Sequence, residues 1–149
     1  MQEVTLEVVQ SRMNSIEFMR RTGVVAEEVS YGFGRARMPL KGNENHVGGM
    51  YIGALSVLAE AGAAICGSTM TDFDRFFPVV RNMNLSFLKP AYSDVTAEYR
   101  LSDLEQKELL GALEETGRAE YTASLDLLDE GGVVVATAES TITILTRRD

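Results

Sequence analysis

The chain has 149 residues, of which 45% are hydrophobic and 24% are charged, and its formal net charge is −8. These proportions are typical of a globular protein, and the length predicts one domain over residues 1–149. The acidic balance excludes a general nucleic-acid surface, which needs a basic face, but not a local basic pocket for a phosphorylated ligand. No apolar run is long enough to span a membrane, and the N-terminus does not resemble a signal peptide. We therefore expect a cytoplasmic protein.

The first third of the chain predicts a helix, an extended segment and a loop. Apolar residues recur at steps of three and four over residues 3–20, which indicates an amphipathic helix, and Gly23 follows its expected end. Residues 24–40 have the alternating pattern of an extended segment. Residues 41–49, KGNENHVGG, contain two asparagines and three glycines and predict a loop rich in turns.

The segment after this loop is the least polar in the chain. Over residues 50–66 only Tyr51, Ser56 and Glu60 are polar. The content of Ala, Leu and Met favours a helix that continues to Ser68, and apolar residues on every face indicate that the helix is buried all round. Glu60 is the unusual feature, because buried carboxylates are rare unless they are paired or functional.

The second half of the chain alternates between apolar and polar residues, as strands do. The predicted strands span residues 79–91, 94–101 and 119–145, and the last range is a hairpin that turns at residues 130–132. A helix interrupts them, since Ser102 and Glu105 have the spacing of a capping box and Gly117 follows the helical pattern. Closely spaced strands pair antiparallel, and an apolar helix must be wrapped by their sheet. We predict an α+β fold with one long central helix in a curled antiparallel sheet.

Three stretches carry a resemblance to a known fold. They are RARMPLKGNENHVGGMYIGALSVLAEAGA, NMNLSFLKPAYSDVTAE and DEGGVVVATAESTITIL. In this order they resemble the hotdog fold, and more closely the PaaI-like thioesterases and the related hotdog domains of unknown function. The resemblance implies a thioesterase that acts on an acyl-CoA or acyl-carrier thioester without a metal or cofactor. It also implies a homodimer, with a tetramer as an alternative, whose pocket forms between two protomers.

The resemblance assigns the catalytic positions. Asn45 matches the active-site asparagine before the helix, and Glu60 matches the acid on the helix. Ile52 and Gly53 match the two glycines at the helix start, where unpaired backbone N–H groups can hold an oxyanion. Glu60 is expected to have a raised pKa, which suits a general base or a nucleophile, and Asn45 is expected to orient water or substrate.

Further positions are expected to contact substrate. Tyr51 stands where the family has a histidine, and Val80 stands where some members have serine or threonine. His46 and Arg81 complete the set of substrate-binding candidates. Other basic residues considered for contacts to a phosphate are Arg75, Lys89 and Arg147.

Three alternatives remain open from the sequence. In the first alternative, Glu60 has a structural role and forms an ion pair with one of three arginines, which are Arg35, Arg81 and Arg100. His46 lies fourteen residues before Glu60, a spacing similar to the His…Glu pair of the β-hydroxyacyl-ACP dehydratases, another hotdog family. A non-catalytic acyl-binding domain is the third alternative. Whichever holds, we expect a dimer, because the apolar strands MNLSFL and STITIL are predicted at the ends of the sheet, where edges need covering.

Overall fold

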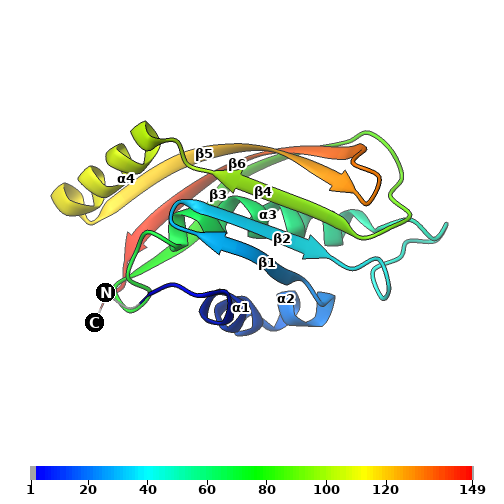
Figure 1. Ribbon diagram of the computed structural model, residues 1–149, viewed down its shortest axis with the longest axis horizontal. Coiled ribbons are helices and arrows are strands. Elements are labelled where there is room, and N and C mark those ends of the chain that lie inside the picture. The colour runs from blue at the N-terminus through cyan, green and yellow to red at the C-terminus, as the bar shows by residue number, and fades with distance from the viewer. Residues whose placement is uncertain (1–2, 149) are drawn as a thin grey trace.

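The computed structural model describes residues 3–148. Six strands form one sheet in the order β1-β2-β4-β5-β6-β3, and every neighbouring pair is antiparallel. The long helix α3 (Ile52–Ser68) lies along one face of the curled sheet, and α1 and α2 lie beside it (Figure 1). This arrangement confirms the predicted α+β hotdog fold.

The remaining elements have the following bounds. The strands are β1 (Val25–Ser30), β2 (Phe33–Met38), β3 (Phe76–Phe87), β4 (Val95–Arg100), β5 (Arg118–Asp129) and β6 (Val134–Thr146). The other helices are α1 (Leu6–Asn14), α2 (Glu17–Thr22) and α4 (Asp103–Thr116). Within residues 3–148, no helix is long and apolar enough to cross a membrane.

The N-terminal third differs from the sequence prediction in two places. The single helix predicted over residues 3–20 is two helices, because Ile16 has an extended backbone with φ −89° and ψ 105°. The single extended segment predicted over residues 24–40 is a hairpin of β1 and β2, which turns at Gly32 with φ 73°. Periodicity alone did not reveal either break. Gly23 ends α2 in the left-handed conformation, as predicted.

The second half of the chain follows the prediction more closely. Ser102 and Glu105 form the predicted capping box at the start of α4, and Gly117 ends this helix with φ 70°. The β5–β6 hairpin turns at residues 130–132, as expected. The first strand of this half, β3, begins at Phe76, three residues before its predicted start.

Helix α3 packs closely on the sheet because small residues lie at the contact. A Cβ atom at Gly62 would lie 2.8 Å from that of Ala97 on β4, and a Cβ at Gly34 on β2 would overlap Ile65 of the helix. The helix is not buried all round, however. Ile52 is 50% exposed. The residues that follow it at steps of four along the helix are half-buried, and they are Ser56, Glu60 and Ala64. This stripe marks the side of α3 that the sheet does not cover.

The edges of the sheet are β1 and β3. The expectation for MNLSFL is confirmed for residues 83–87, which lie in the edge strand β3. The expectation for STITIL is wrong, because residues 140–145 lie in β6, which is paired with β3 on one side and β5 on the other. The strand β3 lies at this edge because the chain crosses the sheet twice, from β2 through α3 to β3 and then back from β3 to β4.

Candidate active site

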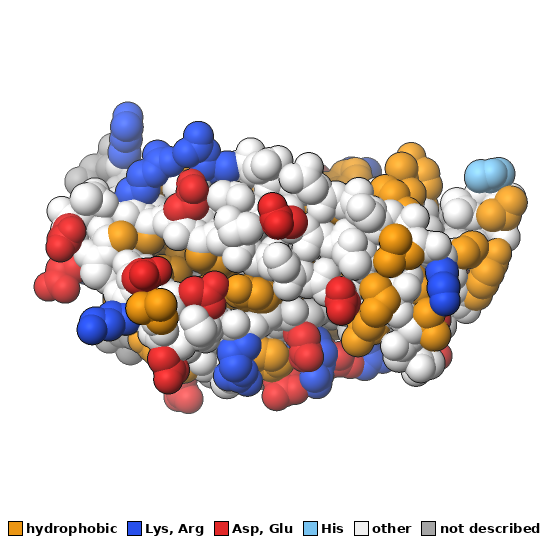
Figure 2. Space-filling model, turned by 90° about the horizontal axis from the view of Figure 1, so that it is seen from above, with side chains coloured by type: hydrophobic (Ala, Val, Ile, Leu, Met, Phe, Trp, Pro, Cys, Tyr) orange, Lys and Arg blue, Asp and Glu red, His pale blue; other side chains and the backbone are white. Residues whose placement is uncertain are grey.

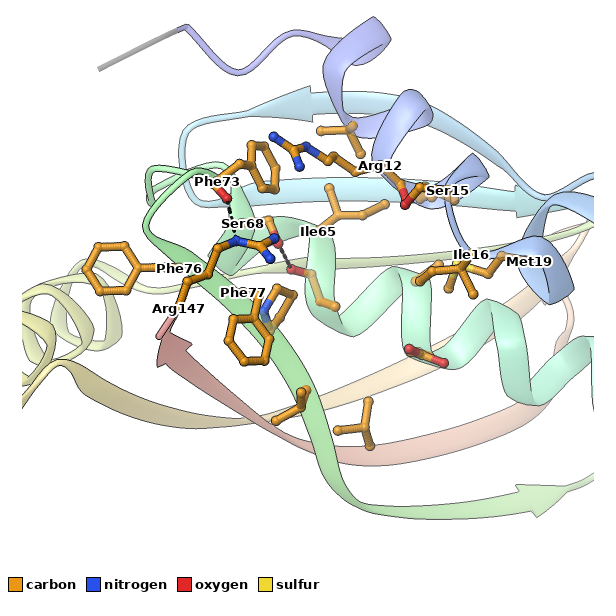
Figure 3. A pocket seen from close by; sticks show the side chains of 18 residues that line it. Arg12, Ser15, Ile16, Met19, Ile65, Ser68, Phe73, Phe76, Phe77 and Arg147 are labelled. Atoms are coloured by element: carbon orange, nitrogen blue, oxygen red, sulfur yellow. Dashed lines mark hydrogen bonds between the residues drawn. The ribbon is translucent and has the colours of Figure 1, made fainter. Parts of the chain in front are cut away.

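A cavity of about 300 Å³ opens between three parts of the fold. Helices α1 and α2 form one wall, the exposed side of α3 forms the second, and β3 forms the third (Figure 3). Most of its lining is aliphatic or aromatic, and it includes Phe73, Phe76 and Phe77. A cavity of this size and polarity is at the small end of the range seen for small-molecule sites.

Glu60 is the acidic side chain in this lining. It makes no hydrogen bond or ion pair with any of residues 3–148. Burial therefore acts on it without compensation, and the loss of solvation raises the pKa of its carboxyl from the ordinary value of 4.5. A half-buried carboxylate with no partner is costly to ionise, so it binds a proton more readily than an exposed carboxylate. A general base needs this property, whereas a carboxylate in a structural ion pair lacks it.

The structural reading of Glu60 is wrong, because each of the three arginines is engaged elsewhere. Arg35 pairs with Glu27, Glu28 and Glu98 on the outer face of the sheet. Arg81 lies 3.6 Å from the carboxylate of Glu120. Arg100 lies over the ring of Phe33, 4.4 Å from its centroid.

The loop before α3 is held by its two asparagines. The Oδ1 atom of Asn45 accepts hydrogen bonds from the backbone N–H groups of Val47 and Gly49, each at 3.0 Å. The Nδ2 atom of Asn43 donates to the carbonyls of Thr22 and Pro39, each at 2.8 Å. Asn45 therefore shapes the loop, whereas Asn43 fastens it to the end of α2 and of β2. The Nδ2 group of Asn45 has no hydrogen-bond partner within residues 3–148.

The start of α3 presents free backbone donors. Tyr51 is the N-cap residue, and its side chain makes no capping hydrogen bond. The first amides of any helix have no partner within the helix, and no other group among residues 3–148 accepts from those of Ile52 and Gly53. Ile52 is exposed and Gly53 is half-buried, so this end of the helix lies at the surface of the protomer.

The structure separates the predicted site residues into two groups within one protomer. Glu60 and Val80 line the cavity. Five others, which are Asn45, His46, Tyr51, Ile52 and Gly53, lie at the N-terminal end of α3 and do not line it. Eight residues of helix separate Ile52 from Glu60, a rise of about 12 Å. Arg81 belongs to neither group, because its guanidinium pairs with Glu120 on β5.

Sequence reasoning missed one wall of the cavity. Arg12 and Ser15 of the α1–α2 segment line it, as do Phe73, just before β3, and Phe77 within β3. The helical pattern of residues 3–20 was read only as an amphipathic face, because periodicity does not say which element it covers. The three phenylalanines within residues 73–77 were the available signal. Within residues 3–148, no three His, Cys, Asp or Glu side chains gather where they could hold a metal ion.

The family can be stated from the sequence comparison. The family model described as a domain of unknown function (DUF4442) matches residues 9–144. The chain belongs to this family. No curated protein matches the sequence.

Solved structures with the same fold include several named as thioesterases. A protein of unknown function from Pseudomonas aeruginosa, named a probable thioesterase, is 37% identical, with a TM-score of 0.85, and the match covers 98% of this chain and 99% of that one. A mutant thioesterase from the same organism is 19% identical, with a TM-score of 0.76 and coverage of 98% and 97%. A thioesterase from Haemophilus influenzae is 18% identical, with a TM-score of 0.74 and coverage of 97% and 93%. The last two similarities show the fold alone.

Proposed function

We propose that this protein hydrolyses acyl thioesters, carried on CoA or on an acyl-carrier protein, with Glu60 as the catalytic carboxylate. The observation that carries the proposal is the unpaired carboxylate in an otherwise apolar cavity, with a pKa raised by burial. The name of the Pseudomonas aeruginosa relative, a probable thioesterase, supports the same reaction.

The proposed reaction needs only water and protein groups. Glu60 takes a proton from a water molecule, whose oxygen attacks the thioester carbon. The backbone amides of Ile52 and Gly53 hold the negative charge that develops on the carbonyl oxygen. The C–S bond then breaks, and the departing thiolate takes up the proton held by Glu60, so that the products are a carboxylic acid and a thiol and the carboxylate is restored. Asn45, through its free amide group, orients the substrate or the water.

The two groups of residues must come from different protomers in this proposal. Within one chain Glu60 lies about 12 Å from the start of its own helix, too far for both to contact one carbonyl. Exposed apolar residues at the loop end of α3, which include Val47, Tyr51 and Ile52, are positioned to be covered by a second copy. Figure 2 shows hydrophobic side chains gathered at this end of the molecule. The partner's helix start would then bring Tyr51, His46 and the oxyanion amides to the cavity that holds Glu60 and Val80.

We therefore expect a homodimer at least, with β3 as the edge strand at the interface. Light scattering at micromolar concentration measures this directly. A strictly monomeric protein would exclude the shared site, and with it the proposed mechanism.

A mixing experiment tests the shared site itself. Ile52→Pro removes one oxyanion amide at the first helical position, where proline fits the helix. Each homodimer of Ile52→Pro or of Glu60→Gln is expected to be inactive. After subunit exchange, half of the dimers are mixed and each holds one intact site, so about a quarter of wild-type activity should return. If activity does not return although native mass spectrometry detects mixed dimers, the two groups do not act across an interface.

A panel of acyl thioesters distinguishes the proposed reaction from the two alternatives. Release of free thiol supports hydrolysis, whereas reversible hydration of an enoyl thioester supports a dehydratase. Thermal stabilisation by the ligands without turnover supports an acyl-binding domain. Within one protomer His46 is exposed on the loop and does not line the cavity of Glu60. The proposed dimer would bring it there together with the oxyanion amides, so the products formed distinguish a dehydratase from a hydrolase.

A further inference from the structure

The same cavity has two arginines at the end away from Glu60. Arg12 of α1 and Arg147, just after β6, both line it, together with Ser68 at the end of α3. Ser68 is eight residues beyond Glu60, so this end lies about 12 Å along the helix from the carboxylate. Figure 3 shows both guanidinium groups beside Phe73, on the side of the cavity where α3 ends.

Both arginines are held in place by the aromatic wall. The Nε atom of Arg147 donates to the carbonyl of Phe73 at 3.1 Å, and its guanidinium lies 5.4 Å from the centroid of the Phe77 ring. Arg12 lies 5.2 Å from the centroid of the Phe73 ring. Contacts of this kind fix the direction of a long side chain, so less rotamer entropy is lost when a ligand binds.

The charge of these arginines is only partly neutralised by the protein. Arg12 lies 3.5 Å from the carboxylate of Asp74, which is 87% exposed, and an ion pair this exposed contributes little. The terminal nitrogens of Arg147 make no hydrogen bond or ion pair with any of residues 3–148. In a chain with a net charge of −8, this end of the cavity is a local positive site.

We propose that Arg12 and Arg147 bind an anionic group of the thioester substrate, carried about 12 Å from the thioester carbon that is attacked by the water which Glu60 activates. This inference rests on the proposed hydrolysis. Guanidinium groups pair with phosphate and carboxylate oxygens through two parallel N–H donors. The anion is therefore a phosphate of the thiol carrier or a carboxylate at the far end of the acyl group.

The neighbouring basic residues do not share this position. Arg75 lies over the ring of Phe76, 5.2 Å from its centroid, but does not line the cavity. Arg81 is paired with Glu120. Arg75 is therefore a matched control, with the same charge, the same kind of aromatic contact and a place beside the cavity.

Steady-state kinetics with matched substrates test the site. Decanoyl-phosphopantetheine and decanoyl-pantetheine differ only in the phosphate of the carrier, and in sebacoyl-pantetheine a carboxylate replaces the terminal methyl of the decanoyl chain. A ten-carbon acyl chain is long enough to place that carboxylate near the arginines. For Arg12→Gln and Arg147→Gln we expect KM to rise about tenfold or more for the substrate that carries the bound anion, with kcat little changed. A rise for decanoyl-phosphopantetheine identifies the carrier phosphate, and a rise for sebacoyl-pantetheine identifies the acyl carboxylate. Decanoyl-pantetheine should be unaffected, as should every substrate with Arg75→Gln.

Equal effects on the charged and the neutral substrates, or equal effects of Arg75→Gln, would overturn the anion site. Calorimetry with phosphopantetheine and with sebacate separates this result from failure of the proposed function, because it needs no turnover. If the protein hydrolyses none of the thioesters but Arg147→Gln weakens the binding of one anion, the anion site is supported and the proposed hydrolysis is wrong. If hydrolysis occurs but the arginine variants change neither KM nor binding for the charged compounds relative to the neutral one, the hydrolysis is supported and the anion site is wrong.

Discussion

Replacing Glu60 with glutamine is expected to lower kcat/KM for thioester hydrolysis by about a hundredfold or more, the usual contribution of a general base. Glutamine keeps the shape of the side chain and can still bind water, but it cannot take up a proton. Because Glu60 has no ion-pair partner to lose among residues 3–148, the fold should persist. Thiol release by the purified variant, together with its circular dichroism spectrum, measures both parts of this prediction.

The difference in stability between the wild type and this variant should depend on pH in a defined direction. Burial raises the pKa of Glu60, so folding favours its protonated form. This contribution is fully present below the unfolded-state pKa and is lost as the pH rises through the higher folded-state pKa. At neutral pH the Gln variant, which carries no charge to desolvate, should therefore be as stable as the wild type or more stable. The difference should vanish at a pH below the ordinary carboxyl range.

Glu105 is a control with the opposite sign. Partial burial raises its pKa, but hydrogen bonds from the Ser102 backbone and the Tyr99 hydroxyl, at 2.7 and 2.8 Å, outweigh this and leave it lowered. Its stabilising effect is present above the unfolded-state pKa and is lost as the pH falls. Glu105→Gln should therefore cost stability at neutral pH and leave hydrolysis unchanged.

A Glu60→Gln variant that retains full activity, or that melts far below wild type at neutral pH, would show that Glu60 is not the base.

Replacing Gly34 with alanine is expected to destabilise the protein by about 3 kcal/mol, through overpacking of the core. The added methyl group would overlap the Cγ2 and Cβ atoms of Ile65 and lie 3.3 Å from the backbone nitrogen of Cys66. Neither neighbour can move freely, because both belong to the buried part of α3. The helix must shift away from the sheet, which also displaces Glu60, so activity should fall with stability.

Thermal unfolding measures this effect, and a loss of about 3 kcal/mol corresponds to about 6–12 °C in Tm for a chain of this size. Gly111→Ala is the matched control, since a Cβ atom there meets nothing within 4 Å. In the interior of α4, alanine should stabilise the protein by up to about 1 kcal/mol. Measurements at one protomer concentration keep any dimer contribution constant. A Gly34→Ala variant as stable as Gly111→Ala would mean that α3 does not pack this closely on β2.

The sequence predicted those elements whose signals are local. The capping box of Ser102 and Glu105 and the left-handed glycines Gly23 and Gly117 need only residues within one or two turns of each other, and all appear where expected. The break at Ile16 and the turn at Gly32 were missed. At both places the apolar pattern continues across the boundary, so periodicity gave no sign that the chain changes direction.

The sequence by itself also determined that an apolar helix carries one carboxylate, Glu60, in an α+β sheet fold. Only the tertiary structure decided what surrounds that carboxylate. Arg35 lies on β2 before the helix, whereas Arg81 and Arg100 lie on β3 and β4 after it. Each of them contacts another partner and not Glu60. The strand order, which leaves β3 at an edge, likewise depends on a crossover that no short pattern encodes. The cavity exists because that edge, the α1–α2 segment and one stripe of α3 meet in space, and the free energy of such packing depends on contacts between residues distant in the chain.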